Sequence, residues 1–207
     1  MGRSIGPKNK LSRRFGVNLN LKTNATKVAR RLSQVPGQHG PNKRGKALSS
    51  FGKQLAEKQK AKIMFGMRER QFSNFVTKAT GMQGDSGVNL QQLLEMRMDN
   101  VVYRMGFAVT RAQARQMVSH SMFFLNGKKM NIPSHNVKIG DVISVKENKT
   151  KKKLFEGMKE RLMNYEMPSW LKLESNGLSG KVLHKPAQND FEKVFDIKLI
   201  IESYSAR

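Results

Sequence analysis

Apolar residues recur at spacings of three and four between residues 89 and 106, as they do on one buried face of an α-helix. Asn89 precedes this stretch as a helix N-cap, and Gly106 follows it as a C-terminal stop. The spacing therefore predicts one amphipathic helix, whose inner face carries Leu90, Leu93, Leu94, Met98, Val101 and Met105.

A second, shorter helix is predicted to begin directly after Thr110, which is a good N-cap, with Gln113 at its third helical position. Its inner face carries Ala114, Met117 and Val118. The middle of the chain is therefore expected to hold two neighbouring amphipathic helices.

After these helices the periodicity changes to that of a sheet. Residues 122–125 are apolar and partly aromatic, and Asn126-Gly127 is the strongest short signal for a hairpin, because both turn positions require positive φ. Residues 130–132 are expected to return along the second strand. Gly140-Asp141 then precedes a further strand at residues 142–145.

Upstream, residues 47–81 are predicted to be helical, with Ser49 or Ser50 as the N-cap and a break at Gly66. The second of the two helices covers residues 67–78. Phe51 and Leu55 follow helical spacing in the first of these helices. Phe72, Phe75 and Val76 of the second are expected to enter a core.

Downstream, residues 154–165 are predicted to form a helix that Pro168 ends. Residues 170–171, 181–183 and 197–201 are interpreted as strands of an antiparallel sheet. Trp170, the single tryptophan, is expected to be buried in packing rather than stacked on a base.

The composition points to a polyanionic partner. The 207 residues include 39 Lys and Arg against 15 Asp and Glu, a formal net charge of +24, which favours nucleic acid over an anionic membrane surface. The absence of cysteine excludes disulfides, thiolate zinc sites and cysteine nucleophiles. Without a membrane-length apolar run or a signal-peptide core, we expect a cytoplasmic or organelle-interior protein.

The positive charge is concentrated near the N-terminus. Residues 1–70 hold 18 Lys and Arg but two acids, Glu57 and Glu69, so they carry +16 of the +24. We expect this segment to bind a polyanion and to depend on it for order. Residues 35–40, VPGQHG, predict a rigid turn, in which His39 bonds to backbone or phosphate rather than acting as a catalytic base.

Arg111 and Arg115 lie four residues apart and therefore share one face of the second central helix. Two interpretations stay open. The first is an ordinary solvated helix face. The second is a phosphate-binding face beside Lys128 and Lys129, which follow the hairpin turn. The net charge of the chain favours the second.

The central stretch strongly resembles the RNA-binding module named after small-subunit ribosomal protein four. The matching residues are Leu94-Glu95, Arg97, Asp99-Asn100-Val101-Val102-Tyr103-Arg104, Gly106-Phe107, Arg111, Ala114-Arg115-Gln116, Val118-Ser119-His120, Asn126-Gly127, Ile132-Pro133-Ser134 and Gly140-Asp141. The module also occurs in tyrosyl-tRNA synthetases and pseudouridine synthases, so by itself it implies RNA binding, not a ribosome.

The resemblance continues in order over nearly the whole chain. Further matching residues are Gly6-Pro7-Lys8, Arg13-Arg14, Val35 to Gly40, Glu57 to Lys62, Gly66, Glu69-Arg70-Gln71-Phe72, Pro168, Trp170-Leu171, Gly180, Val182, Pro186, Leu199-Ile200-Ile201-Glu202 and Tyr204-Ser205. The chain thus resembles the bacterial-type family of small-subunit ribosomal protein four. Since many relatives carry four zinc-binding cysteines near the N-terminus, it is similar to the zinc-free branch.

The resemblance implies an α+β fold: a basic N-terminal segment and a helical domain, followed by an αα-β RNA-binding module extended into an antiparallel sheet. The expected segments are a basic extension at 1–46, a helical domain at 47–88, the module at 89–150 (core about 97–157), and a helix with sheet strands and a tail at 151–207.

The resemblance also implies a structural, non-enzymatic function without a cofactor or metal. The expected partners are small-subunit rRNA at a helix junction of the 5′ domain, small-subunit protein five, also protein three, and mRNA near its entry path. We expect neither a membrane nor a stable homo-oligomer. The implied roles are nucleation of the subunit body and a contribution to decoding accuracy, in the cytoplasm or an organelle. The alternative is an RNA-binding accessory or modification factor.

The expected RNA contacts come from the basic positions of both halves of the chain. They are Arg3, Lys8, Lys10, Arg13, Arg14, His39, Lys43, Arg44, Lys58, Lys62, Arg70, Arg97, Arg104, Arg111, Arg115, His120, Lys128 and Lys129.

Overall fold

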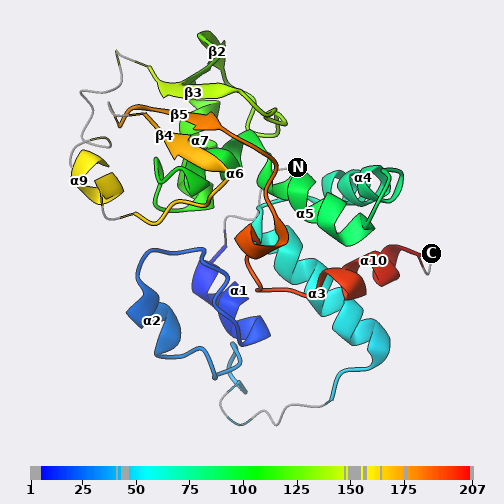
Figure 1. Cartoon of the computed structure of the whole chain (residues 1–207). Helices are drawn as coiled ribbons and strands as arrows, with labels where there is room; N and C mark the ends of the chain where they lie inside the picture. The colour runs from blue at the N-terminus through cyan, green and yellow to red at the C-terminus, as the bar shows by residue number, and fades with distance from the viewer. Residues whose placement is uncertain are drawn as a thin grey trace. The chain divides into compact units, whose positions relative to one another are not determined.

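The computed structural model consists of two compact units (Figure 1). The first comprises Met1–Leu90 and Glu192–Arg207, and the second Gln91–Phe191, so the division falls within one helix. The structure describes residues 6–40, 42, 47–146, 148, 155, 158–163, 165–174 and 177–205.

The first unit is helical. Its elements are α1 (Lys8–Phe15), α2 (Ala25–Ala29), α3 (Ser50–Met64), α4 (Glu69–Thr80), the start of α5 (Ser86–Glu95) and α10 (Ile197–Ser205). The prediction for residues 47–81 is confirmed: the Ser49 hydroxyl accepts the Gly52 N–H at 3.2 Å and caps α3. Gly66, at φ +61°, separates α3 from α4.

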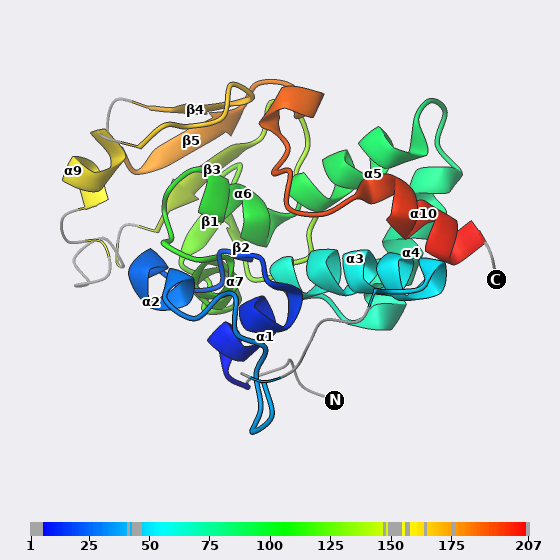
Figure 2. The ribbon, with the colours of Figure 1, turned by 90° about the horizontal axis from the view of Figure 1, so that it is seen from below.

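The strand predicted at residues 197–201 is wrong, because these residues belong to helix α10. The helix lies along α3, as Figures 1 and 2 show. Ile200 is fully buried, and Tyr204, four residues later, reaches the Glu69 carboxylate on α4. The β-branched isoleucines favour a strand locally, but packing against helices decides the outcome.

The core of the first unit contains Phe72 and Val76 of α4, as expected, whereas Phe75 is half-buried. Phe51 and Leu55 lie on α3 but face outward, with 71 % and 37 % of their surfaces exposed. Helical spacing therefore placed these two residues on a helix without placing them in the core.

The second unit is an α+β unit, which confirms the expected fold class. Its elements are the end of α5, α6 (Met98–Arg104), α7 (Arg111–Ser119), β1 (Phe123–Leu125), β2 (Lys128–Met130), β3 (Val142–Val145), α9 (Met158–Met163), β4 (Leu171–Leu173), β5 (Ser179–Val182) and a 3₁₀ turn, η2 (Gln188–Asp190). The strands form one antiparallel sheet in the order β2-β1-β3-β5-β4.

The single helix predicted over residues 90–105 is wrong: α5 ends at Glu95 and α6 begins at Met98. The backbone between them pairs with the loop before β3. The Val137 N–H donates to the Met96 carbonyl at 2.9 Å, and the Met98 N–H to the His135 carbonyl at 2.8 Å. These long-range bonds interrupt a helix that the local apolar spacing would continue.

The predicted N-cap Asn89 is also wrong, since it lies inside α5, where its N–H donates to the Asp85 carbonyl at 2.9 Å. Two other turn predictions are confirmed. Thr110 caps α7 by accepting the Gln113 N–H at 3.2 Å. Asn126 and Gly127 both have positive φ, +50° and +75°, in the hairpin that joins β1 to β2.

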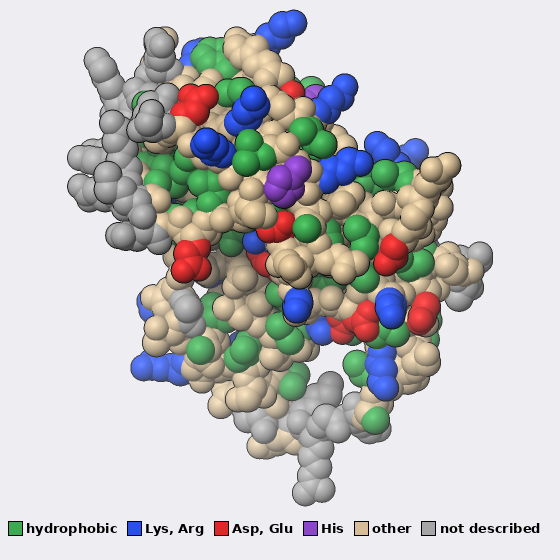
Figure 3. Space-filling view, in the orientation of Figure 1, with side chains coloured by type: hydrophobic (Ala, Val, Ile, Leu, Met, Phe, Trp, Pro, Cys, Tyr) green, Lys and Arg blue, Asp and Glu red, His purple; other side chains and the backbone are tan. Residues whose placement is uncertain are grey.

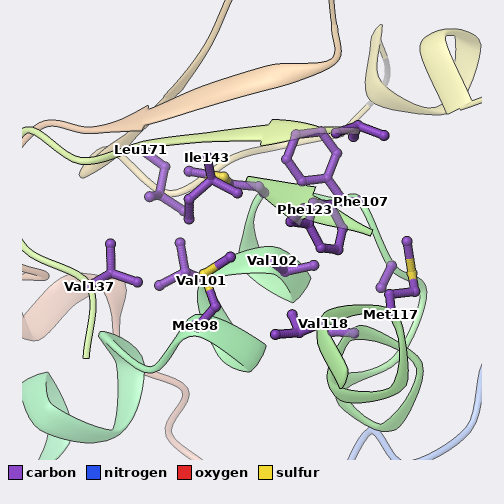
Figure 4. Close-up of a cluster of buried hydrophobic side chains, with 14 of the residues drawn as sticks. Met98, Val101, Val102, Phe107, Met117, Val118, Phe123, Val137, Ile143 and Leu171 are labelled. Atoms are coloured by element: carbon purple, nitrogen blue, oxygen red, sulfur yellow. The ribbon is translucent and has the colours of Figure 1, made fainter. Parts of the chain in front are cut away.

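The core of the second unit fills the space between α6, α7 and the sheet (Figure 4). The Phe107 and Phe123 rings pack with their centroids 5.8 Å apart. Trp170 is fully buried, as expected. The labelled members of the cluster are Met98, Val101, Val102, Phe107, Met117, Val118, Phe123, Val137, Ile143 and Leu171.

Across the part of the chain that the structure describes, no helix is long and apolar enough to cross a bilayer.

Candidate nucleic-acid interface

The arginines of α6 and α7 are fixed by acids within the second unit. Arg97, just before α6, donates through Nε and Nη2 to the Asp99 carboxylate at 3.1 and 2.8 Å. Arg115 of α7 donates through Nη1 to the same carboxylate at 2.9 Å. Asp99 therefore joins the two helices, and its carboxylate is 7 % exposed.

A second acid, Glu95, binds Arg104 in the same two-pronged way, with N–O distances of 2.8 and 2.9 Å. The Asn100 amide also donates to Glu95, at 2.7 Å, and its carbonyl accepts from Arg111 Nε at 2.8 Å. The Arg111 guanidinium lies 4.5 Å from the centre of the Tyr103 ring. Each arginine orientation is thus set by neighbours on α5 and α6.

These contacts bear on the two interpretations of the face that carries Arg111 and Arg115. Arg97 is fully buried, and Arg111 is 8 % exposed, so neither lies on an ordinary solvated face. The Arg104 and Arg115 side chains are 12 % and 23 % exposed. Arg115 therefore has the largest accessible share, and the RNA contacts expected of all four stay predictions.

The network carries excess positive charge. Four arginines, Arg97, Arg104, Arg111 and Arg115, face two carboxylates, those of Glu95 and Asp99, which leaves a net charge of +2. Charges held in a partly desolvated cluster act on a phosphate more strongly than the same charges on solvated surface chains. The cluster is therefore suited to binding an anion at its exposed rim.

The hairpin adds two exposed lysines, Lys128 and Lys129. The turn between the strands is tied to β3, because the Asn126 carbonyl accepts the Val142 N–H at 2.9 Å and its amide donates to Asp141 at 2.8 Å. The lysines therefore project from an anchored hairpin, which would suit contacts with the phosphate backbone of a nucleic acid.

In the first unit, Arg13 of α1 holds the VPGQHG loop. Its Nε donates to the Gln34 carbonyl at 2.9 Å and its Nη2 to the Val35 carbonyl at 3.3 Å. A Cβ on Gly40 would lie 1.8 Å from the Val35 carbonyl oxygen, so this turn requires glycine. His39 is exposed at its tip.

Lys58 and Lys62 of α3 both bind Glu69 of α4, at 2.8 and 3.0 Å, and the Tyr204 hydroxyl donates to Glu69 at 2.8 Å. Burial alone would raise the pKa of Glu69. The hydrogen bonds from Lys58, Tyr204 and Lys62, with the charge of Lys58, outweigh burial and lower the pKa to about 2. The expected RNA contacts of these lysines stay predictions, and Lys58 is itself buried.

The remaining sequence-predicted positions that the structure describes all have accessible surface. Lys10, Arg14, His39, Arg70 and His120 are exposed, and Lys8 is half-buried, whereas Arg3, Lys43 and Arg44 lie outside the described residues. On the face drawn in Figure 3, blue Lys and Arg side chains and red Asp and Glu side chains are intermixed.

Sequence reasoning missed the acidic and amide partners of the arginines: Glu95, Asp99 and Asn100. A signal was available, since Glu95 and Asp99 are two acids four residues apart with Arg97 between them. From helical spacing alone, the Glu95 and Asp99 side chains would be expected to face solvent. They face the arginines because the chain breaks between α5 and α6, and that break depends on backbone hydrogen bonds to the loop before β3.

Comparison with known proteins agrees with the geometry. The model of the ribosomal protein S4/S9 N-terminal domain matches residues 3–95, and that of the S4 domain matches residues 96–143. The small ribosomal subunit protein uS4 of Roseiflexus castenholzii is 43 % identical over 207 residues, which cover 99 % of this chain and the whole relative. The uS4 protein of Chloroflexus aurantiacus is 44 % identical over the same length, and uS4A of Psychromonas ingrahamii 43 %.

The chain belongs to the uS4 family of small ribosomal subunit proteins.

The boundary between the two family models coincides with the helix break. The N-terminal model ends at Glu95, the last residue of α5, and the S4-domain model begins at Met96. The arginine network therefore lies within the uS4 RNA-binding module, with Glu95 contributed from just before it. The four segments expected from the sequence stay a prediction, since they divide the chain differently from both the family models and the two compact units.

Among the residues that the structure describes, no group of three or more His, Cys, Asp or Glu side chains is arranged to hold a metal ion.

Proposed function

We propose that this chain is a structural constituent of the small ribosomal subunit that binds rRNA directly. The observation that carries the proposal is full-length similarity, above 40 % identity, to proteins named small ribosomal subunit protein uS4. The arginine network and the hairpin lysines supply the positive groups that such binding needs.

The finer assignment is a helix junction in the 5′ domain of 16S-type rRNA. Each unit carries excess positive charge, since the first has 22 Lys and Arg against six Asp and Glu, and the second 17 against nine. Two basic units can bind two arms of one junction, and the deep, narrow major groove of A-form RNA favours recognition by shape and phosphates. Nucleation of the subunit body would follow from fixing those arms.

The proposed neighbours are small-subunit proteins five and three, with mRNA passing near its entry path and decoding accuracy affected through protein five. A structural rather than catalytic function fits this position, in the cytoplasm or in an organelle that makes ribosomes. The alternative, an accessory or modification factor, would share the module, but the relatives that match at full length are named as ribosomal proteins.

The test measures binding of the purified chain to a transcribed 5′-domain rRNA fragment over a range of salt concentrations. Duplex DNA of equal charge is the control. We expect RNA binding to persist at salt concentrations where DNA binding is lost, because non-specific phosphate contacts weaken steeply with salt. Equal loss on both nucleic acids would refute the proposal.

A further inference from the structure

Asp99 occupies an unexpected place for an acid in a polyanion-binding protein. Its carboxylate lies between Arg97 and Arg115, accepting from both within 3.1 Å. An acid beside a phosphate site repels the ligand by charge alone. We propose that Asp99 is nevertheless a positioning residue for RNA binding, which holds the Arg115 guanidinium in the orientation that receives a backbone phosphate. This inference rests on the function proposed above.

The first step of the argument concerns charge. Arg97 is fully buried and grips both oxygens of Asp99, so the two side chains form a neutral pair below the surface. Arg104 and Glu95 form a second neutral pair. The net charge of +2 therefore resides on the two α7 arginines. Arg115 is bound by Asp99, whose charge Arg97 already offsets, and Arg111 is bound by the uncharged amide of Asn100.

The second step concerns exposure. Arg115 binds Asp99 through Nη1 while its side chain remains 23 % exposed, more than any other arginine of the network. A guanidinium has five donors in a planar fork, so contact with a carboxylate at one end leaves donors for a phosphate at another. Arg115 is thus the member best placed to contact both Asp99 and a ligand.

The third step concerns entropy. A free arginine side chain loses much of its rotamer freedom when it is fixed in one orientation. Asp99 fixes Arg115 in the free protein, so the loss of side-chain entropy on RNA binding is smaller. Repulsion between Asp99 and a phosphate is small because Arg97 neutralises the Asp99 charge. The gain from holding Arg115 in place outweighs this repulsion.

The experiment compares the wild-type chain with D99N, R115Q and the double variant D99N/R115Q for binding to the 5′-domain fragment over a salt series. E166Q is the matched control, because Glu166 is an exposed acid of the same unit and its loss changes the net charge equally. We expect D99N to bind about tenfold more weakly, although it is more positive by one charge. E166Q should bind as tightly as wild type, or up to about twofold more tightly.

The salt slope separates positioning from simple destabilisation. Partial unfolding would lower affinity by the same factor at every salt concentration, whereas a lost phosphate contact reduces the slope by roughly one unit. We expect D99N and R115Q each to lose about one unit, and the double variant to lose no more than R115Q alone. Additive losses, or D99N binding like E166Q, would overturn the proposal.

Loss of a buried ion-pair partner can also prevent folding, which thermal unfolding of D99N would reveal. R115K then provides the test with Asp99 intact. Lysine keeps the charge but lacks the planar fork, so we expect about threefold or more weaker binding with an unchanged slope. Wild-type affinity for R115K would overturn the inference. Failure of the wild-type chain to prefer RNA over DNA would instead reject the proposed function.

Discussion

Glu69 is the point at which three helices of the first unit meet. Lys58 and Lys62 reach it from α3 and Tyr204 from α10, while Glu69 itself begins α4. One carboxylate thus pairs with two lysines of a strongly basic segment, offsets one of their two charges and attaches the C-terminal helix. Lys58 and Lys62 therefore stabilise the fold of the first unit through Glu69.

We predict that Glu69 makes the stability of the first unit depend on acid pH. Its pKa falls from 4.5 to about 2 on folding, so its contribution is complete above about pH 4.5 and is lost as pH falls toward 2. At pH 7, E69Q should lower the free energy of unfolding by about 1 kcal/mol. The effect is modest because the Glu69 side chain is 41 % exposed and its charge is partly screened by solvent. Chemical denaturation at pH 7 and pH 3 measures both effects.

The control is Y204F, which removes one donor and keeps the charge. It should raise the pKa of Glu69 from about 2 toward its ordinary value, as followed by the carboxyl chemical shift in an NMR titration. A wild-type Glu69 that titrates near 4.5 would contradict the prediction.

At the scale of elements, α3 and α4 use their aromatic residues in opposite ways. Phe72 of α4 is fully buried and Phe51 of α3 is 71 % exposed, although both follow helical spacing in the sequence. The difference arises because α10 lies along α3, and this contact fixes which side of α3 is inward.

We predict that the two phenylalanines differ widely in their effect on stability. F72A should lower the free energy of unfolding by about 3–5 kcal/mol, because it leaves a cavity in the core. F51A is the matched substitution and should change it by less than about 0.5 kcal/mol. Urea denaturation of both variants measures the difference, and similar losses would show that Phe51 packs inward.

At the scale of the whole molecule, both units carry net positive charge, +16 in the first and +8 in the second. In the second unit part of that charge is held in the arginine network, and part projects from the edge of the sheet. The hairpin strand β2 forms one edge of the five-stranded sheet and β4 forms the other.

We predict that phosphate contacts are made at the β2 edge. K128Q/K129Q should weaken RNA binding and reduce its salt slope by roughly one unit per lost contact, with unchanged thermal stability because both lysines are exposed. K172Q/K181Q is the charge-matched control, since these exposed lysines are paired on β4 and β5. Equal slope changes in both double variants would mean that the charge acts without regard to position.

Features that depend only on neighbouring residues could be predicted before the fold was known. The Asn126-Gly127 hairpin, the Thr110 cap and the break at Gly66 follow from local backbone preferences and are predicted by the sequence. The cap of α3 is narrowed by sequence to Ser49 or Ser50, and the structure shows Ser49. The resemblance to a ribosomal family was also readable, because it rests on residue order. The basic positions expected to contact RNA were named from the sequence as well, and their RNA contacts stay predictions.

The tertiary structure alone decided what depends on residues far apart in the chain. Backbone bonds to the loop before β3 divide residues 90–105 into two helices, and packing on α3 makes a helix of residues 197–205. The same long-range contacts bring Asp99 beneath Arg115. Local sequence shows the charges of these two residues, but only the folded chain determines that one holds the other.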